Sequence, residues 1–220
     1  MRISWRSEVL SLALIAAMLV LAGLTWGAAP ERLPVHWDIK GTPDRFGGKA
    51  EGLLAIPATA VGIYVLMLVL PRFDPRRRHY ELFAGVYNLI RTLLVAFLFA
   101  LYLVVVLWAR GIPVRVEKIT PLLVGALLIV LGSYMGKLRS TWFVGIRTPW
   151  TLSSEESWNK THRLGGKVFI LGGAASILVG LLRSEYAVWA MIALLAGGML
   201  ALTVFSYIWW KHDPNRQEIP

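Results

Sequence analysis

Long apolar runs alternate with short polar segments along the whole chain. Each run approaches the ~20 residues that a helix needs to cross the hydrocarbon core of a bilayer. The runs lie at residues 8–29, 53–71, 83–108, 119–136, 167–183 and 186–209. Because a backbone in lipid must satisfy its own hydrogen bonds, runs of this length favour helices over the ~10-residue strands of a membrane barrel. The pattern predicts an all-α integral membrane protein, a bundle of about six transmembrane helices.

The spacing of the runs divides the chain into three regions. Residues 1–82 hold the first two spans and an outside loop at 30–52. Residues 83–118 hold the third span and a connection, and residues 119–220 hold the last three spans. A polar segment at 137–166 separates the fourth span from the fifth.

Composition agrees with a membrane protein. The chain is 56% hydrophobic and only 16% charged, and its mean hydropathy is +0.59. It has no cysteine, which excludes disulfides, thiolate nucleophiles and cysteine-based metal sites. Arg2, Arg6 and the small residues 27–29 also fit a signal peptide. The first apolar run is longer than the ~7–15 residues of a signal core, so we expect an uncleaved span.

The distribution of positive charge predicts the orientation. Segments 1–7, 72–82, 137–167 and 210–220 hold 14 of the 23 Lys and Arg residues, and the segments on the opposite side hold 8. Positive charge accumulates on the cytoplasmic side, so we expect both termini to lie in the cytoplasm. The net charge of +10 then reflects topology and contact with lipid headgroups rather than direct binding of nucleic acid.

The polar segment between the fourth and fifth spans has its own local signals. Pro149 restricts Thr148 to extended geometry, and Ser153 with Glu156 has the spacing of a capping box, which predicts a helix from about residue 154. On that helix Glu155, Asn159 and His162 share one face, with Trp158 adjacent. Gly165-Gly166 is expected to end the helix before the fifth span. We interpret it as a short helix at the cytoplasmic interface, with Trp158 at headgroup depth.

The order of residues in this segment resembles the signature of the SdpI-type immunity proteins, bacterial membrane proteins that protect a cell from its own sporulation-delaying toxin. The matching residues are Gly145, Arg147, Thr148, Pro149, Trp150, Thr151, Leu152, Trp158, Thr161, His162, Gly165 and Gly166. The resemblance implies protection against a secreted peptide toxin outside the cell. It also implies capture of a cytoplasmic repressor protein at the membrane.

Three interpretations of the signature segment stay open. It can anchor spans four and five at the membrane surface, dock a cytoplasmic partner, or use a glutamate with His162 for acid–base chemistry. No nucleophile accompanies that pair, so we predict no catalytic residue, no cofactor and no metal site. The predicted binding residues are Arg147, Thr148, Pro149, Trp150, Glu156, Trp158 and His162.

The outside loop is the second candidate site, with His36, Asp38, Gly41, Pro43 and Asp44 as its residues. Glycines and proline predict tight turns and a compact folded loop, and the segment resembles an amino-terminal domain fused to many SdpI-type proteins. His36 and Asp38 lie two apart, so in extended chain they share a face. They either form part of a metal site or hold the loop onto the helix ends.

Inside the membrane, Arg91 is a costly charge that is either functional or directed back to the headgroups, and Asn88 is its expected neighbour. Glycines at 166, 173 and 180 form a small-residue stripe that predicts close packing of spans five and six. A small transporter or a metal-dependent membrane enzyme is the alternative function. The oligomeric state is not predicted.

Overall fold

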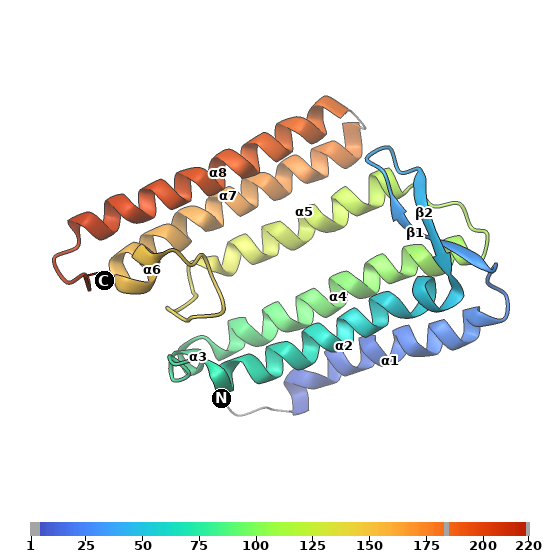
Figure 1. Cartoon of the computed structure of the whole chain (residues 1–220), viewed down its shortest axis with the longest axis horizontal. Helices are drawn as coiled ribbons and strands as arrows, with labels where there is room; N and C mark the ends of the chain where they lie inside the picture. The colour runs from blue at the N-terminus through green and yellow to red at the C-terminus, as the bar shows by residue number, and fades with distance from the viewer. Residues whose placement is uncertain (1–4, 183–184, 219–220) are drawn as a thin grey trace.

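The computed structural model describes residues 5–182 and 185–218, and Figure 1 shows them as a long helical bundle with a small hairpin at one end. The elements in chain order are α1 (Trp5–Trp26), β1 (Arg32–Trp37), β2 (Pro43–Gly48), α2 (Lys49–Phe73), α3 (His79–Leu82), α4 (Ala84–Ala109), α5 (Val116–Met135), α6 (Pro149–Ser153), α7 (Glu155–Leu182) and α8 (Glu185–His212). Arg2 and Arg183, which entered the charge count, lie outside the described residues.

The long helices form two groups of three. Helices α1, α2 and α4 pack together, and α5, α7 and α8 form the second group, with α4 against α5 between them (Figure 1). We call the end with β1 and β2 the hairpin end. The opposite end, where α2, α5 and α8 finish and α4 and α7 begin, is the loop end.

The prediction of an all-α multi-pass membrane protein is confirmed. Among the described residues six helices are long and apolar enough to cross a membrane, at Glu8–Trp26, Lys49–Phe73, Ala84–Ala109, Val116–Met135, Glu155–Leu182 and Tyr186–His212. Many large apolar side chains on them are exposed, such as Leu24, Leu66 and Leu200. In a bilayer these surfaces face lipid.

The predicted helix end at Gly165-Gly166 is wrong. Helix α7 continues through both glycines from Glu155 to Leu182. A glycine weakens a helix in water because its backbone can bond to solvent instead, but a backbone in lipid has no such alternative. The separate interfacial helix is therefore the beginning of the fifth span.

The predicted compact outside loop is an antiparallel β-hairpin that rests on the start of α2. Its register pairs Leu33 with Gly47, and Leu33 is fully buried against Gly52 of α2. Gly41, with φ of +78°, lies in the connecting turn and abuts Glu117 at the start of α5. Gly47 and Gly48, which were also expected in tight turns, are instead the last two residues of β2. The hairpin thus contacts both halves of the bundle.

The small-residue stripe on α7 faces α5, so its assignment to span six is wrong. A Cβ built on Gly173 would lie 2.6 Å from the carbonyl oxygen of Gly125, and one on Gly166 would lie 2.6 Å from that of Gly132. Both α5 glycines are also seven residues apart. The Ser176 hydroxyl donates to the Pro121 carbonyl at 2.8 Å in the same contact. Helices α5 and α7 therefore meet almost backbone to backbone.

Candidate functional site at the loop end

The segment that connects α5 to α7 folds around two buried aromatic rings. Trp158 and His162, one turn apart on α7, are stacked with ring centroids 4.0 Å apart, and both are shielded from solvent. The Trp158 indole N–H donates to the Leu138 carbonyl at 2.9 Å. Trp158 and His162 therefore support the loop from inside the protein, and neither side chain is available at the surface as an anchor or a partner contact.

His162 is held as a neutral ring by its two partners. Its Nε2 accepts the backbone N–H of Ile146 at 2.9 Å, so this nitrogen carries no proton. Its Nδ1 lies 2.8 Å from the Trp158 carbonyl and donates to it. This tautomer uses both nitrogens for structure, and neither is left for acid–base chemistry.

Gly145 allows the loop to close over these rings. Its φ is +121°, and a Cβ at this position would lie 2.5 Å from His162 Nε2 and 2.8 Å from the Trp158 ring. A residue with a side chain would be strained there and would also collide with both rings. The glycine of the signature therefore has a steric role.

The predicted residues Thr148 and Pro149 start the short helix α6. Thr148 is its N-cap, accepting the Thr151 N–H at 3.1 Å, and Pro149 occupies the first turn, where its missing N–H costs nothing. The Thr148 hydroxyl also lies 3.0 Å from that of Ser206, which ties the segment to α8. The capping box is thus at Thr148 and Thr151, not at Ser153 and Glu156.

The residue that caps α7 is Ser154. Its hydroxyl oxygen accepts the Ser157 N–H at 2.9 Å and donates to the Asp213 carboxylate at 2.5 Å. Ser153, the predicted cap, instead donates to the Pro149 carbonyl at 2.7 Å. The start of α7 is therefore fastened to the chain that follows α8.

Among the predicted binding residues, four lie at least partly at the surface: Arg147, Pro149, Trp150 and Glu156. The Arg147 guanidinium is exposed and donates to the Trp142 carbonyl at 2.7 Å. Trp150 is half-buried and packs edge-on against Tyr207 of α8, with centroids 5.3 Å apart. Glu156 pairs with Lys160 along the exposed face of α7. These four are predicted binding residues that a partner can contact directly.

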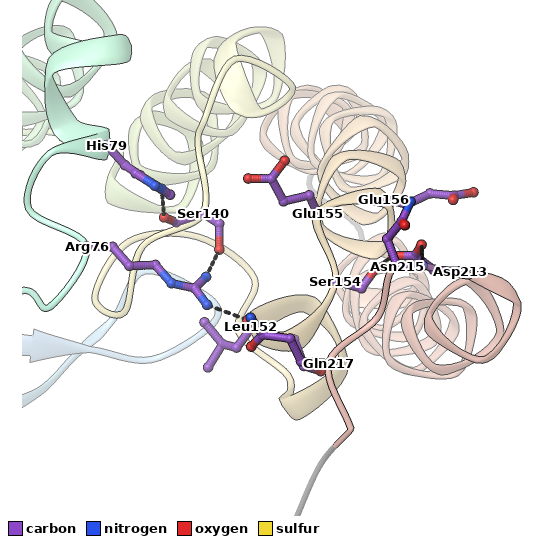
Figure 2. A pocket seen from close by; sticks show the side chains of 11 residues that line it. Arg76, His79, Ser140, Leu152, Ser154, Glu155, Glu156, Asp213, Asn215 and Gln217 are labelled. Carbon is purple, nitrogen blue, oxygen red and sulfur yellow. Dashed lines mark hydrogen bonds between the residues drawn. The ribbon is translucent and has the colours of Figure 1, made fainter.

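A polar cavity of about 510 Å³, the loop-end pocket, opens beside this segment. Figure 2 shows its lining, which comes from the α2–α3 connection, the first residue of α3, the segment before α6, the end of α6, the start of α7 and the chain after α8. The residues are Arg76, His79, Ser140, Leu152, Ser153, Ser154, Glu155, Glu156, Asp213, Asn215 and Gln217. Guanidinium, imidazole and amide donors face carboxylate acceptors, so the pocket suits a polar group of mixed charge.

Hydrogen bonds fix the positions of the pocket's basic side chains. The Arg76 guanidinium donates to Ser140 Oγ and to the Leu152 carbonyl, the latter at 2.6 Å. His79 Nδ1 lies 2.7 Å from the Ser140 carbonyl (Figure 2). Glu155, which is exposed, projects from the first turn of α7 into the space between these groups. The side of the pocket with Arg76 and His79 is therefore held in a fixed arrangement by hydrogen bonds, whereas the exposed Glu155 side chain on the other side can change its position.

Asp74 organises the α2–α3 connection behind the pocket. Its carboxylate accepts the Tyr80 hydroxyl at 2.9 Å and the backbone N–H groups of Trp142 at 2.9 Å and Arg76 at 2.7 Å. Burial and the hydrogen bond to Asp74 raise the pKa of Tyr80 above its usual value, so the hydroxyl remains a donor. Asp74 thus joins the two halves of the bundle at the loop end.

The sequence interpretation missed the pocket residues outside the signature. Arg76 was considered only as a topology determinant, and Asp74 and Asp213 were not considered. A signal exists, because Asp74-Pro75 and Asp213-Pro214 each directly follow an apolar span. In both, the aspartate accepts the N–H two residues on, at 2.7 and 2.8 Å, the geometry of a turn that stops a helix.

At the hairpin end, the predicted residues His36 and Asp38 have separate partners. His36 Nδ1 lies 2.6 Å from the Asp44 carboxylate across the hairpin, with both side chains largely exposed. Asp38 accepts the N–H groups of Lys40 and Thr42 at 2.9 and 2.8 Å and closes the turn before Pro43. Within the described parts of the chain, no cluster of three or more metal-ligating side chains is found.

Arg91 is fully buried and pairs with Glu8 of α1, not with Asn88 as predicted. The second oxygen of Glu8 accepts the Tyr64 hydroxyl at 2.8 Å, and the guanidinium carbon lies 5.6 Å from the Tyr64 ring centre. The guanidinium is therefore held inside the protein by this ion pair and does not extend to the protein surface. Arg91 connects all three helices of the first half.

Comparison with known proteins confirms the resemblance to the SdpI-type immunity proteins. Residues 137–209 match the model of the SdpI/YfhL protein family, and residues 13–61 match a domain of unknown function, DUF1648. The chain is 24% identical over 206 residues to the immunity protein SdpI of Bacillus subtilis (strain 168), and the alignment covers 94% of this chain and 97% of that protein. No solved structure matches the chain.

Proposed function

We propose that the protein is a membrane immunity protein that protects the cell producing it against a secreted peptide toxin. The observation that carries the proposal is the similarity to the Bacillus subtilis immunity protein, which extends over nearly the full length of both chains. It includes the hairpin as well as the signature segment. No catalytic residues are assigned, because His162 is engaged on both nitrogens by structural partners.

We further propose that the protein lies in the bacterial cytoplasmic membrane with the loop end and both termini in the cytoplasm. The excess of Lys and Arg in the segments at this end supports that orientation. A reporter active only in the cytoplasm, fused after Pro220, is expected to be active. A tag placed between residues 40 and 41 is expected to be labelled from outside intact cells. Labelling of both sites from the same side would contradict the orientation.

The loop-end pocket is the surface that we propose for a cytoplasmic repressor. Its volume of about 510 Å³ and its mixed charges suit the side chains of a docked protein segment better than an apolar ligand. Arg147 and Trp150 lie nearby on the surface, and residues of these types contribute strongly to protein interfaces. Trp158 and His162 would act indirectly, by holding the segment in place.

Survival of toxin-sensitive bacteria that express the chain tests protection, with the sporulation-delaying peptide toxin as the challenge. Wild type is expected to restore growth. Arg147→Ala is expected to keep normal membrane abundance and lose repressor capture, whereas Trp158→Ala is expected to lower abundance and protection together. Lys211→Ala, another exposed cation at the same end, is the matched control. Death of cells that contain normal amounts of wild-type protein would refute the immunity function.

A further inference from the structure

A second cavity at the loop end has a lining dominated by arginine. It has a volume of about 500 Å³ and lies between the end of α2, the α2–α3 connection and α4. The described residues that line it are Leu68, Pro71, Arg72, Arg77, Arg78, Glu81 and Arg91. We call it the arginine pocket. Glu81 is the one acid among these residues, and Glu8 pairs with Arg91, so the lining keeps a net positive charge from its other arginines.

Arg91 brings unused hydrogen-bond donors to this pocket. Its Nη2 donates to Glu8, but its Nε and Nη1 are buried without a hydrogen-bond partner among the described residues. A buried charged donor without an acceptor is costly, by roughly 1–3 kcal/mol or more. An acceptor that enters the pocket would remove this cost. The ion pair with Glu8 therefore leaves half of the guanidinium available for a ligand.

The pocket opens beside the end of one membrane-spanning helix, α2, and the beginning of another, α4. Arg91 is seven residues into α4, about 10 Å along the helix at 1.5 Å per residue. Arg72, Arg77 and Arg78 are exposed at its rim, where α2 ends and the connection to α3 begins. Leu68 and Pro71 supply an apolar wall on the membrane side. The arrangement is cationic toward the aqueous side and apolar toward the bilayer.

We propose that the arginine pocket binds a phosphate group, carried by an anionic phospholipid or present as a free anion. Guanidinium groups form paired, charge-assisted hydrogen bonds with phosphate oxygens. Arg91 would donate from Nε and Nη1 to the innermost phosphate oxygen, and the rim arginines would donate to the others. Basic pockets between transmembrane helices are suited to headgroups of this kind. This inference does not depend on the immunity function.

Native mass spectrometry of the full-length protein in detergent tests the proposal, with dioleoyl phosphatidylglycerol, dioleoyl phosphatidylcholine and inorganic phosphate as probes. Wild type is expected to bind one phosphatidylglycerol molecule or one phosphate ion about tenfold more tightly than phosphatidylcholine. Binding of phosphatidylglycerol that millimolar phosphate does not displace identifies a lipid site. Preferential binding of inorganic phosphate identifies a free-anion site. Equal retention of both lipids, with no bound phosphate, would overturn the proposal.

Two variants separate the pocket from general surface charge. Arg77→Gln with Arg78→Gln removes two exposed rim charges, and Lys137→Gln with Arg139→Gln removes two exposed charges elsewhere at the loop end. Only the first pair is expected to weaken binding, by about tenfold. Arg91→Lys keeps a positive charge for Glu8 but lacks the spare nitrogens, and it is expected to weaken binding similarly. Wild-type affinity in the rim variant would also overturn the proposal, since its substitutions lie on the surface and leave the fold intact.

Discussion

In the first half of the bundle, the apolar contact of α1, α2 and α4 includes a buried group of polar side chains, whereas in the second half α5 and α7 meet at glycines. The first contact is built from Glu8, Tyr64 and Arg91, together with a hydrogen bond of 3.0 Å between Ser11 and Thr92. The second repeats along the helices, with Gly125 against Gly173 and Gly132 against Gly166. Lipid tails are as apolar as the helix surfaces, so neither half can rely on the hydrophobic effect for helix association.

The polar contact of the first half and the glycine contact of the second half differ in how the stabilising energy is distributed among residues. Charges within a span are stable only in each other's presence, so the first contact specifies its partners strongly but depends on single residues. Close packing of small residues adds many weak dispersion contacts along the helix and depends on shape. A single substitution in the first half should therefore lower stability by leaving a charge unpaired. A single substitution in the second half should lower it through a steric clash.

The largest effect is expected from Glu8→Ala. It leaves Arg91 buried without its counter-charge, at a cost of about 3–5 kcal/mol. Thermal unfolding in detergent, followed by size-exclusion fluorescence, should show a strongly lowered midpoint. The double variant Glu8→Leu with Arg91→Leu removes both charges and is expected to recover most of the loss. A double variant as unstable as Glu8→Ala would show that packing, and not the unpaired charge, causes the effect.

Gly173→Ala should have the next largest effect, because its new Cβ would lie 2.6 Å from the Gly125 carbonyl oxygen, a backbone atom that cannot turn away. Separating α5 from α7 is expected to cost about 1–3 kcal/mol. Gly197→Ala on α8 is the matched control, since a Cβ there meets nothing within 4 Å. It should be neutral or slightly stabilising, because alanine favours helices. Equal unfolding midpoints for the two variants would contradict the close α5–α7 contact.

The six spans could be predicted from sequence because the length of an apolar run alone decides whether a helix can cross a bilayer. The sequence could not predict which side chains of the different spans contact each other. Arg91 was recognised as out of place, but its partner Glu8 is 83 positions away in the chain, and no local spacing connects the two. The one available hint was that the first and third spans each contain a charge, and that these charges are opposite.

In the signature segment, the sequence identified the residues that match the family but did not indicate which of their side chains are buried. A Trp and a His beside charged residues were interpreted as a surface, whereas α7 turns their common face inward against the loop. The glycine stripe of α7 was recognised and given the wrong partner, although Gly125 and Gly132 repeat it at the same interval. The proposed roles of Arg147, Trp150 and the hairpin, and the division into regions at residues 82 and 118, remain predictions.

A smaller effect is expected at the loop end of the second half, where a hydrogen bond joins the start of α7 to the chain after α8. Ser154→Ala removes the cap of α7 and the hydrogen bond to Asp213, which should cost about 1 kcal/mol. Ser153→Ala, at the neighbouring position, should stay within about 0.5 kcal/mol. Unfolding midpoints of the two variants measure the difference. If Ser153→Ala were the more harmful, the cap would be at the position that the sequence pattern indicated.

The smallest effect is expected from His36→Ala at the hairpin end. The pair of His36 and Asp44 is largely exposed, and exposed pairs contribute about 0–1 kcal/mol. Asp38→Ala is the informative comparison, because it leaves the N–H groups of Lys40 and Thr42 without their acceptor and should loosen the turn more. Metal analysis of purified wild type and His36→Ala is expected to give the same substoichiometric zinc content. Stoichiometric zinc that disappears in His36→Ala would show a metal site on the hairpin, and it would favour a metal-dependent activity over the immunity function.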